Sequence, residues 1–336
     1  MQHAFILGGT GQIGRAVADR LLQEGWRVTL ASRAPQSALD EQPNLRHVAL
    51  DRRDSGAIAL ALGDGADLLL DCIAFDPADA RQLVEVQRSV GAICAISSAS
   101  VYRDDEGRTL DEARSNGFPE MPVPITTSQP TVRPGDATYS TRKVAMEQIL
   151  LDQCQTPVTL LRPCAIYGPH CRHAREWFFV KRLLDGRREI PVAYGGRSRF
   201  HTSSVQGIAV AVLASASKTA SSVMNVADPV APTVMEIGEA IMRAMGVKAC
   251  IVGLPDRGYP PKVGVTPWSV PKPFVVEPSQ DLESAGSYES LVPPAARWLI
   301  EATRDRPWQE VLPALAAYPF DLFDYEADER VLRAVS

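Results

Sequence analysis

The chain of 336 residues has no apolar run approaching the roughly 18 to 20 residues that span a bilayer. It also has no excess of positive charge. Its net charge of −5 gives no electrostatic reason to expect nucleic acid or an acidic membrane as a partner. Residues 1–7 have neither the basic segment nor the cleavage site of a signal peptide, and we interpret them as a first strand. These features predict a cytoplasmic protein without nucleic-acid or membrane partners.

Paired cysteine motifs are missing as well. Six cysteines are scattered along the chain with no CxxC pair, which is typical of a reduced compartment. The sequence His170-Cys171-Arg172-His173 concentrates metal-binding residue types, but its spacing matches no common zinc pattern and no second ligand pair is evident. We therefore expect no metal site.

Regular alternation of strand and helix patterns fills the first half of the chain. Residues 1–168 predict a dinucleotide-binding domain of the Rossmann type, an α/β fold with a doubly wound parallel sheet. Residues 169–336 predict mainly a smaller substrate-binding lobe, with about 200–228 returning to the first domain. Within this lobe we expect helices over 177–184, 234–245 and, as the last one, about 294–303.

A glycine-rich loop lies between the first strand and an amphipathic helix. Backbone N–H groups of such a loop can approach a pyrophosphate at the helix N-terminus, where the helix dipole favours negative charge. Glycine is needed because a Cβ would hold the phosphate away or forbid the turn. The residues expected to contact the cofactor here are Gly8, Gly11, Gln12, Ile13 and Gly14.

The end of the second strand usually determines which dinucleotide binds. An acidic residue there would hydrogen-bond the ribose diol, but this chain has Ser32 and Arg33. A hydroxyl and a guanidinium suit a 2′-phosphate, so NADP is preferred over NAD. Asp51 and Arg52, after the third strand, are candidate contacts to the adenine side, although residues 51–54 can equally form a simple polar turn.

Three residues form a candidate acid/base set. Tyr139 and Lys143 are four residues apart, so on a helix they lie on the same face. The lysine ammonium, together with an oxidised nicotinamide, would lower the phenol pKa from its usual value near 10. Ser98 follows the fifth strand and could hydrogen-bond the reacting oxygen, with Ser100 beside it as a further substrate contact.

Four motifs in this order resemble the extended short-chain dehydrogenase/reductases, specifically the NAD-dependent epimerase/dehydratase family. They are the glycine loop 8–14, the serine-rich stretch 97–102, the Tyr139/Lys143 pair and the segment 162–169. The resemblance implies Tyr139 as general acid/base, Lys143 as its pKa partner and ribose ligand, and Ser98 as the residue that positions the hydroxyl. It also implies that residues 162–169, including Tyr167, lie beside the nicotinamide. Homodimers are common in that family.

The chain departs from the family pattern at three places. It has no acidic residue next to Ser98, so sugar dehydration is not expected. The turn 71–76 after the fourth strand is bulkier than the usual alanine-rich turn, although we still expect Ile73 and Ala74 to contact the cofactor. Residues 204–209 occupy a stretch where an aspartate usually stands.

Four residues of the second half have two interpretations each. Arg197 and Arg199 lie where related enzymes hold the pyrophosphate of a nucleotide sugar, or they belong to a solvated loop. Trp177 and Phe178 line a substrate pocket, or they belong to the core, which their helical spacing favours.

The sequence therefore predicts an NAD(P)-dependent oxidoreductase or epimerase that transfers a hydride at a secondary alcohol or ketone carbon, with a sugar or nucleotide sugar as candidate substrates. The alternative is a non-catalytic, NAD(P)-binding regulatory or RNA-associated protein of the same fold. The expected partners are a small-molecule substrate and a second copy of the chain.

Overall fold

A seven-stranded parallel sheet forms the centre of the first domain. The computed structural model describes residues 1–33, 42–54, 56–282 and 285–335. In spatial order, the strands are β10 (Ser222–Val226), β6 (Val158–Pro163), β5 (Val90–Ile96), β4 (Ala66–Asp71), β1 (His3–Leu7), β2 (Arg27–Ser32) and β3 (Leu45–Ala49). The order reverses at β1, so the predicted doubly wound sheet is confirmed.

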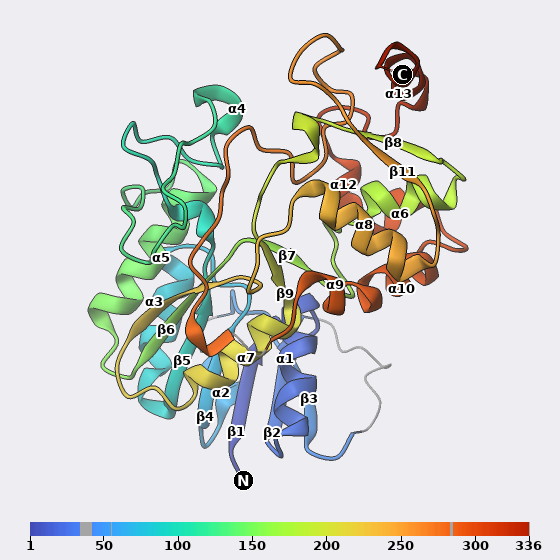
Figure 1. Cartoon of the computed structure of the whole chain (residues 1–336). Coiled ribbons are helices and arrows are strands. Elements are labelled where there is room, and N and C mark those ends of the chain that lie inside the picture. The colour runs from blue at the N-terminus through green and yellow to red at the C-terminus, as the bar shows by residue number, and fades with distance from the viewer. Residues whose placement is uncertain (34–41, 55, 283–284, 336) are drawn as a thin grey trace.

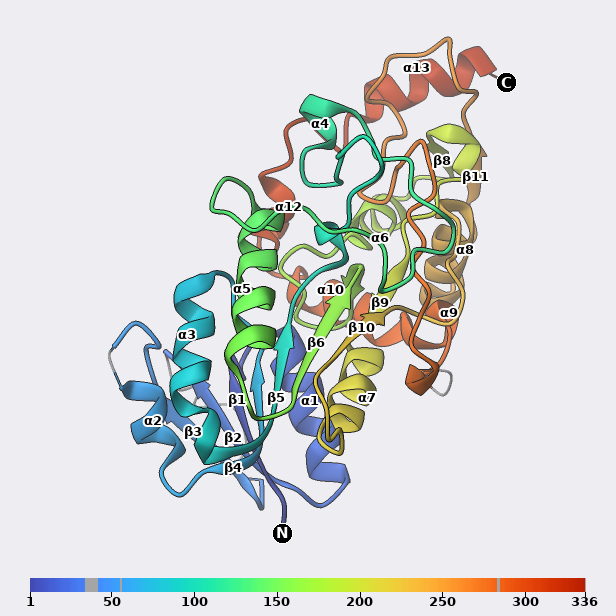
Figure 2. The ribbon, with the colours of Figure 1, turned by 90° about the vertical axis from the view of Figure 1, so that its left-hand side faces the viewer.

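Helices cover both faces of this sheet, because its central strands are apolar on both sides. Along β1, Ala4 and Ile6 pack in one hydrophobic cluster, while Phe5 and Leu7 pack in another. The helices over the first cluster are α1 (Gln12–Gln23) and α7 (Val205–Ser215). Those over the second are α2 (Ala57–Leu62), α3 (Pro77–Val86) and α5 (Tyr139–Gln153). Figure 2 shows α3 and α5 side by side.

A second lobe lies beyond the carboxyl ends of the strands (Figure 1). Two short parallel strands, β7 (Ala165–Tyr167) and β9 (Thr202–Ser204), lie between the sheet and this lobe. The other elements of the lobe are α6 (Trp177–Leu184), α8 (Val234–Met245), α9 (Tyr288–Leu291), α10 (Pro293–Ala302), α11 (Trp308–Val311), α12 (Pro313–Ala316), α13 (Tyr325–Val335), β8 (Glu189–Val192) and β11 (Cys250–Gly253).

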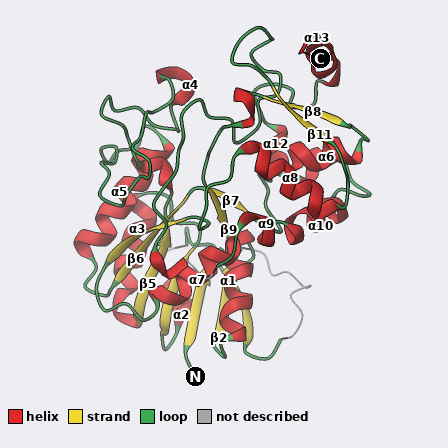
Figure 3. Ribbon diagram, in the orientation of Figure 1, coloured by secondary structure: helices red, strands yellow, loops and turns green. Residues whose placement is uncertain are grey.

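Long loops fill much of the space between the two parts (Figure 3). Residues 103–138 contain one short helix, α4 (Ala113–Asn116), and otherwise follow an irregular path. An isolated bridge joins Ile125 in this loop to Val276 in the proline-rich stretch 254–280. The two loops therefore contact each other at this bridge.

The helices expected over 177–184 and 234–245 are confirmed with these bounds. The prediction that the helix near 294–303 is the last one is wrong, because α11, α12 and α13 follow it. Ala327 and Val331 of α13 are buried against Leu254 and Val263, a contact that local periodicity does not reveal. No helix in the described part of the chain is long and apolar enough to cross a membrane.

Candidate active site

Helix α5 begins at Tyr139 because Thr138 caps it. The Thr138 side chain accepts a hydrogen bond from the Thr141 N–H, and the Thr141 hydroxyl accepts one from the Thr138 N–H at 2.9 Å, a reciprocal capping box. Tyr139 is thus the first residue of the helix, and Lys143 follows one turn later. The two residues therefore lie one turn apart on one helix, as their spacing predicted.

Lys143 is buried and donates hydrogen bonds to the end of β5 and to the turn after β4. Its Nζ donates hydrogen bonds to the Ala74 carbonyl at 2.6 Å and the Ile96 carbonyl at 2.8 Å. Burial lowers the pKa of this ammonium to about 8, and the negative charge of Asp71 opposes that shift. The Nζ lies 5.7 Å from the centre of the Tyr139 ring. The lysine therefore places its charge near the phenol while fixing α5 to β5 and to the turn after β4.

Tyr139 lies at an open cleft, with 42% of its surface exposed. Its ring centre is 5.5 Å from that of Phe75, which comes from the bulky turn after β4. The cleft walls desolvate the phenol and raise its pKa, while the Ser98 side chain opposes this by hydrogen bonding. Without a cofactor, the pKa of the Tyr139 phenol is therefore raised. The sequence analysis predicted a lowered pKa, but that prediction included the positive charge of an oxidised nicotinamide.

A chain of hydroxyls runs from Ser98 to α5. The Ser98 Oγ donates to the Ser100 Oγ at 3.0 Å and accepts from the Ser100 N–H at 3.1 Å. The Ser140 Oγ donates to the Ser100 backbone carbonyl at 2.9 Å. Ser100 therefore holds the Ser98 hydroxyl at the tip of β5, and it also lines the second of the two cavities described below.

Two glycines show why the loop after β1 needs this residue type. Gly8 has φ of +74°, and a Cβ there would lie 2.7 Å from the Ile73 side chain. A Cβ on Gly14 would lie 2.6 Å from the Gly9 Cα, so α1 can approach the loop only with glycine at this position. Gly11 caps α1 with its backbone and has no close side-chain neighbour on its Cβ side. The loop thus presents bare backbone at a helix N-terminus, which fits a pyrophosphate.

The structure describes only part of the predicted binding site for the adenosine half of the dinucleotide. The Ser32 Oγ lies 2.8 Å from the His47 Nε2, and Arg33 is exposed. Residues 34–41, which follow directly, lie outside the described residues. Asp51 pairs with Arg53 at 2.6 Å, and the Arg53 side chain lowers the pKa of Asp51 to about 2.

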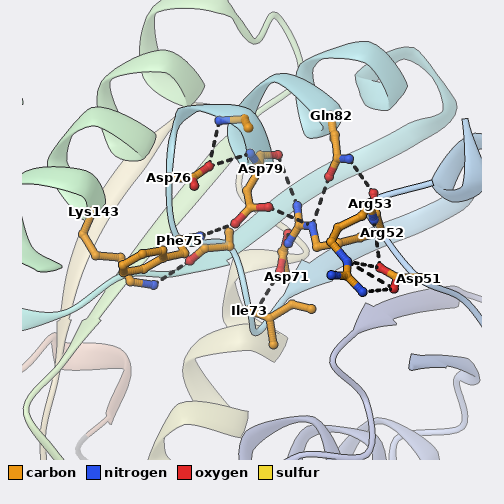
Figure 4. A network of polar contacts seen from close by, with 12 residues as sticks. Asp51, Arg52, Arg53, Asp71, Ile73, Phe75, Asp76, Asp79, Gln82 and Lys143 are labelled. Atoms are coloured by element: carbon orange, nitrogen blue, oxygen red, sulfur yellow. Dashed lines mark hydrogen bonds and ion pairs between the residues drawn. The ribbon is translucent and has the colours of Figure 1, made fainter. Parts of the chain in front are cut away.

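Arg52 lies inside a polar network beneath the turn after β4 (Figure 4). Its guanidinium pairs with Asp71 at 2.9 Å and with Asp79 at 3.0 Å. The Asp71 carboxylate in turn accepts the Ile73 N–H at 2.8 Å. Arg52 therefore shapes the turn from below and does not line the cleft. Ile73 projects with 48% of its surface exposed, whereas the Ala74 side chain is buried.

Two cavities meet at the candidate acid/base residues. The first, which we name the glycine-loop cavity, has a volume of about 650 Å³ and extends from Thr10, Gly11 and Gln12 to the segment 163–175. The second, the aromatic cavity, has about 430 Å³ and extends to Phe118, Phe200, Tyr318 and Phe320. The residues that line both are Ser98, Tyr139, Pro163, Cys164 and Arg175.

Tyr167 does not line either cavity, in contrast to the sequence prediction. It is 1% exposed, and its ring centre lies 4.7 Å from that of Tyr288 in the core of the second lobe. The reason is strand alternation in β7, which turns Ile166 toward the glycine-loop cavity and Tyr167 away from it.

Neither Arg197 nor Arg199 lines the two cavities. Arg197 is exposed and pairs with Asp256 at 3.2 Å, and Arg199 donates to the Ala231 carbonyl at 2.5 Å. Trp177 and Phe178 are buried in the core of the second lobe, so the core interpretation is confirmed.

Residues 204–209, where the family usually has an aspartate, begin next to the carboxyl group of Asp228. The Ser204 side chain caps α7 by accepting the Gly207 N–H at 3.0 Å. Asp228, which follows β10, accepts the Thr202 hydroxyl at 2.6 Å and the Ser204 N–H at 3.1 Å. A buried carboxyl group from the residues after β10 therefore contacts this stretch.

Sequence reasoning missed Arg175 and the aromatic residues of the second cavity. Arg175 stands in a polar run just before α6, where nothing in the local pattern distinguishes it from a solvated arginine. Phe118, Phe200, Tyr318 and Phe320 come from distant segments, so only the fold brings them together. Among the described residues, no group of three or more His, Cys, Asp or Glu is arranged to hold a metal ion.

Solved structures with the same fold cover nearly the whole chain. WbmH from Bordetella bronchiseptica, in complex with NAD+, is 19% identical, with a TM-score of 0.66 over 90% of this chain and 99% of that one. The UDP-N-acetylglucosamine 4-epimerase from Methanobrevibacter ruminantium is 18% identical, with a TM-score of 0.65 over 89% and 98%. The dTDP-glucose 4,6-dehydratase from Bacillus anthracis, in complex with NAD, is 16% identical, with a TM-score of 0.66 over 91% and 99%.

No curated protein sequence gives a significant match. The sequence pattern of the NAD dependent epimerase/dehydratase family matches residues 4–227, from the first strand to the end of β10. That span includes the glycine loop, Ser98 and the Tyr139/Lys143 pair. The chain therefore belongs to the NAD dependent epimerase/dehydratase family.

Proposed function

We propose that this protein is an NAD(P)-dependent oxidoreductase or epimerase that acts at a secondary alcohol or ketone carbon. Its main support is that Ser98 and Tyr139 line both the glycine-loop cavity and the aromatic cavity. A dinucleotide on the glycine loop and a small molecule in the aromatic cavity would meet at these two hydroxyls. The candidate substrates are a sugar, a nucleotide sugar or another secondary metabolite.

Each residue of the set has a distinct task in this proposal. Tyr139 exchanges a proton with the substrate oxygen, and Ser98 holds that oxygen by a hydrogen bond. Lys143 uses two of its three N–H donors on the Ala74 and Ile96 carbonyls, which leaves one for a ribose hydroxyl. Its positive charge stabilises the phenolate of Tyr139. This effect opposes desolvation, which raises the phenol pKa.

The residues that would hold the dinucleotide are those of the glycine loop, Gly8 to Gly14, with Ser32 and Arg33 on the adenosine side. A bound nicotinamide dinucleotide supplies the hydride acceptor for an alcohol, or the donor for a ketone. Ser32 and Arg33 favour NADP because both can donate hydrogen bonds to a 2′-phosphate. Two of the solved neighbours named above, WbmH and the dTDP-glucose 4,6-dehydratase, carry NAD, which supports a dinucleotide at this loop without favouring the phosphate.

Replacement of Tyr139 by Phe tests the catalytic proposal. The expected result is a fall in turnover by about a hundredfold to ten-thousandfold, because proton transfer is lost, with dinucleotide affinity unchanged. Turnover is measured by nicotinamide absorbance over a panel of alcohols, ketones and sugar nucleotides, and affinity by fluorescence titration. Release of reduced dinucleotide identifies a dehydrogenase, and conversion without release identifies an epimerase. Equal turnover of the parent and the variant would refute the proposal.

The assembly state and the compartment stay predictions. A homodimer is expected from the family resemblance, and a cytoplasmic location is expected from the sequence.

A further inference from the structure

Arg175 carries a positive charge for which the described residues offer no counter-ion. Its Nε is buried and has no hydrogen-bond partner, and no described residue forms an ion pair with its guanidinium. The guanidinium carbon lies 5.5 Å from the centre of the Phe200 ring. Charged groups taken out of water are normally paired, so an arginine of this kind is suited to an anionic ligand.

The neighbours of Arg175 do not provide the missing negative charge. Glu176 is directed toward Tyr288, whose hydroxyl donates to its Oε1 at 3.3 Å. Burial raises the pKa of Glu176 to about 7, so much of this carboxyl is neutral at physiological pH. His173 carries no negative charge in any state. The donor fork of Arg175 is therefore available to a bound molecule.

The position of Arg175 relates it to the reacting group. It lines both cavities, as Ser98 and Tyr139 do, so an anion on its guanidinium would share the cavity with the substrate oxygen that these hydroxyls would hold. A guanidinium binds a carboxylate through two parallel hydrogen bonds, which fixes orientation as well as position. Such a contact would direct one particular carbon toward Tyr139.

The rest of the aromatic cavity favours an apolar body on this anionic molecule. Its walls include Phe118, Phe200, Tyr318 and Phe320, and its volume of about 430 Å³ suits a small molecule. A nucleoside diphosphate would need several donors, but Arg197 is paired with Asp256 and Arg199 with the Ala231 carbonyl. The cavity thus combines aromatic walls with the unpaired, partly buried guanidinium of Arg175, while the charged side chains of Asp111 and Arg114 lie at its exposed part.

We propose that Arg175 binds the carboxylate of a compact, largely apolar hydroxy acid or oxo acid and thereby selects this substrate class. The proposal rests on the proposed function, since it names the substrate of the same site. Arg175 is a specificity-determining residue in this account: it holds the acid group while Ser98 and Tyr139 engage the hydroxyl or ketone oxygen. A phosphate monoester could use the same donors, and the experiment separates the two.

Calorimetric titration of the full chain saturated with NADP or NAD tests the proposal without turnover. The probes are hydrocinnamate and isocaproate as carboxylates, hydrocinnamamide as the neutral counterpart, phenyl phosphate, and UDP. We expect the carboxylates to bind about tenfold to a hundredfold more tightly than the amide, the range of a charge-assisted hydrogen-bond pair. Tighter binding of phenyl phosphate or UDP than of either carboxylate would overturn the proposal.

Variants of two arginines complete the experiment. Arg175→Met should remove the preference for carboxylate over amide, and Arg175→Lys should restore part of it, because the charge returns without the planar fork. Arg114→Met is the matched control, since Arg114 is exposed at the same cavity and its loss changes the net charge equally. An undiminished preference in Arg175→Met, or an equal loss in Arg114→Met, would contradict the proposal.

The same titrations separate failure of this inference from failure of the proposed function. Affinity for NADP and for NAD is measured first, in the parent and in Arg175→Met, and every probe titration is then run at a dinucleotide concentration that saturates both proteins, because Arg175 also lines the glycine-loop cavity. If neither dinucleotide binds, the proposed function fails. If the dinucleotide binds and Tyr139→Phe abolishes turnover, but carboxylate and amide bind equally, only the assignment of Arg175 fails.

Discussion

Replacement of Glu176 by Gln should change how stability depends on pH. Glu176 is 1% exposed, one of its carboxyl oxygens has no hydrogen-bond partner, and the other accepts the Tyr288 hydroxyl. Burial raises its pKa from 4.5 to about 7, which Arg175 and the Tyr288 hydroxyl only partly oppose. The folded protein therefore keeps a proton on this carboxyl at pH values where the unfolded chain releases it.

The sign and size of the effect follow from this difference. Because the pKa is raised in the folded state, the contribution to stability is complete below pH 4.5 and is lost as the pH rises to about 7. Each pKa unit corresponds to about 1.4 kcal/mol, so the loss over this interval is about 3 kcal/mol. A glutamine has no proton to release, and the variant should not show this loss.

Urea unfolding followed by tryptophan fluorescence measures the difference. Between about pH 5 and pH 8, the parent should lose about 2 to 3 kcal/mol more of its free energy of unfolding than Glu176→Gln does. Glu301→Gln, which removes an exposed carboxylate from α10, is the control and should follow the parent. Parallel curves for the parent and Glu176→Gln would show that the buried carboxyl is not protonated in the folded state, and the reasoning would fail.

Two further predictions concern the cofactor side of the cleft. Arg52→Met should lower the free energy of unfolding by about 3 to 5 kcal/mol, because Asp71 is left buried and unpaired, and Asp71→Asn in the same chain should restore part of it. Urea unfolding checks this, and an unchanged midpoint would refute the importance of the pair. Arg33→Ser should weaken NADP binding about tenfold and leave NAD binding unchanged, as measured by fluorescence titration. A parent protein that binds both dinucleotides equally would contradict the preference for NADP.

Local chemistry was sufficient to predict much of the sheet domain. Asp76 followed by Pro77 is a pattern typical of a helix start, and the Asp76 carboxylate accepts the N–H groups of Ala78 and Asp79. Regular alternation of strand and helix patterns predicted a parallel sheet, and the glycine loop between strand and helix predicted the first turn. These features depend on neighbours in sequence, and the fold is confirmed on that basis.

Contacts between distant segments were not predictable in this way. Arg52 had the residue type expected for a cofactor contact, but its partners Asp71 and Asp79 are reached only through the fold. The direction of the Tyr167 side chain depends on the pairing of β7 with β9, which the sequence pattern does not specify. Arg175 is a candidate because its unpaired guanidinium lines two cavities, a position that only the fold creates.

The origin of the aromatic cavity also has a consequence for the evolution of the family. The distinctive parts of its wall come from residues 110–118, 265–270 and 318–320, none of which belongs to the seven-stranded sheet. Ser98, Tyr139 and Lys143 instead belong to β5's tip and to α5, which are tied together by hydrogen bonds. Exchange of the three wall segments between homologues, by recombination or by grafting in the laboratory, should therefore give new substrate preferences on an unaltered proton-transfer apparatus.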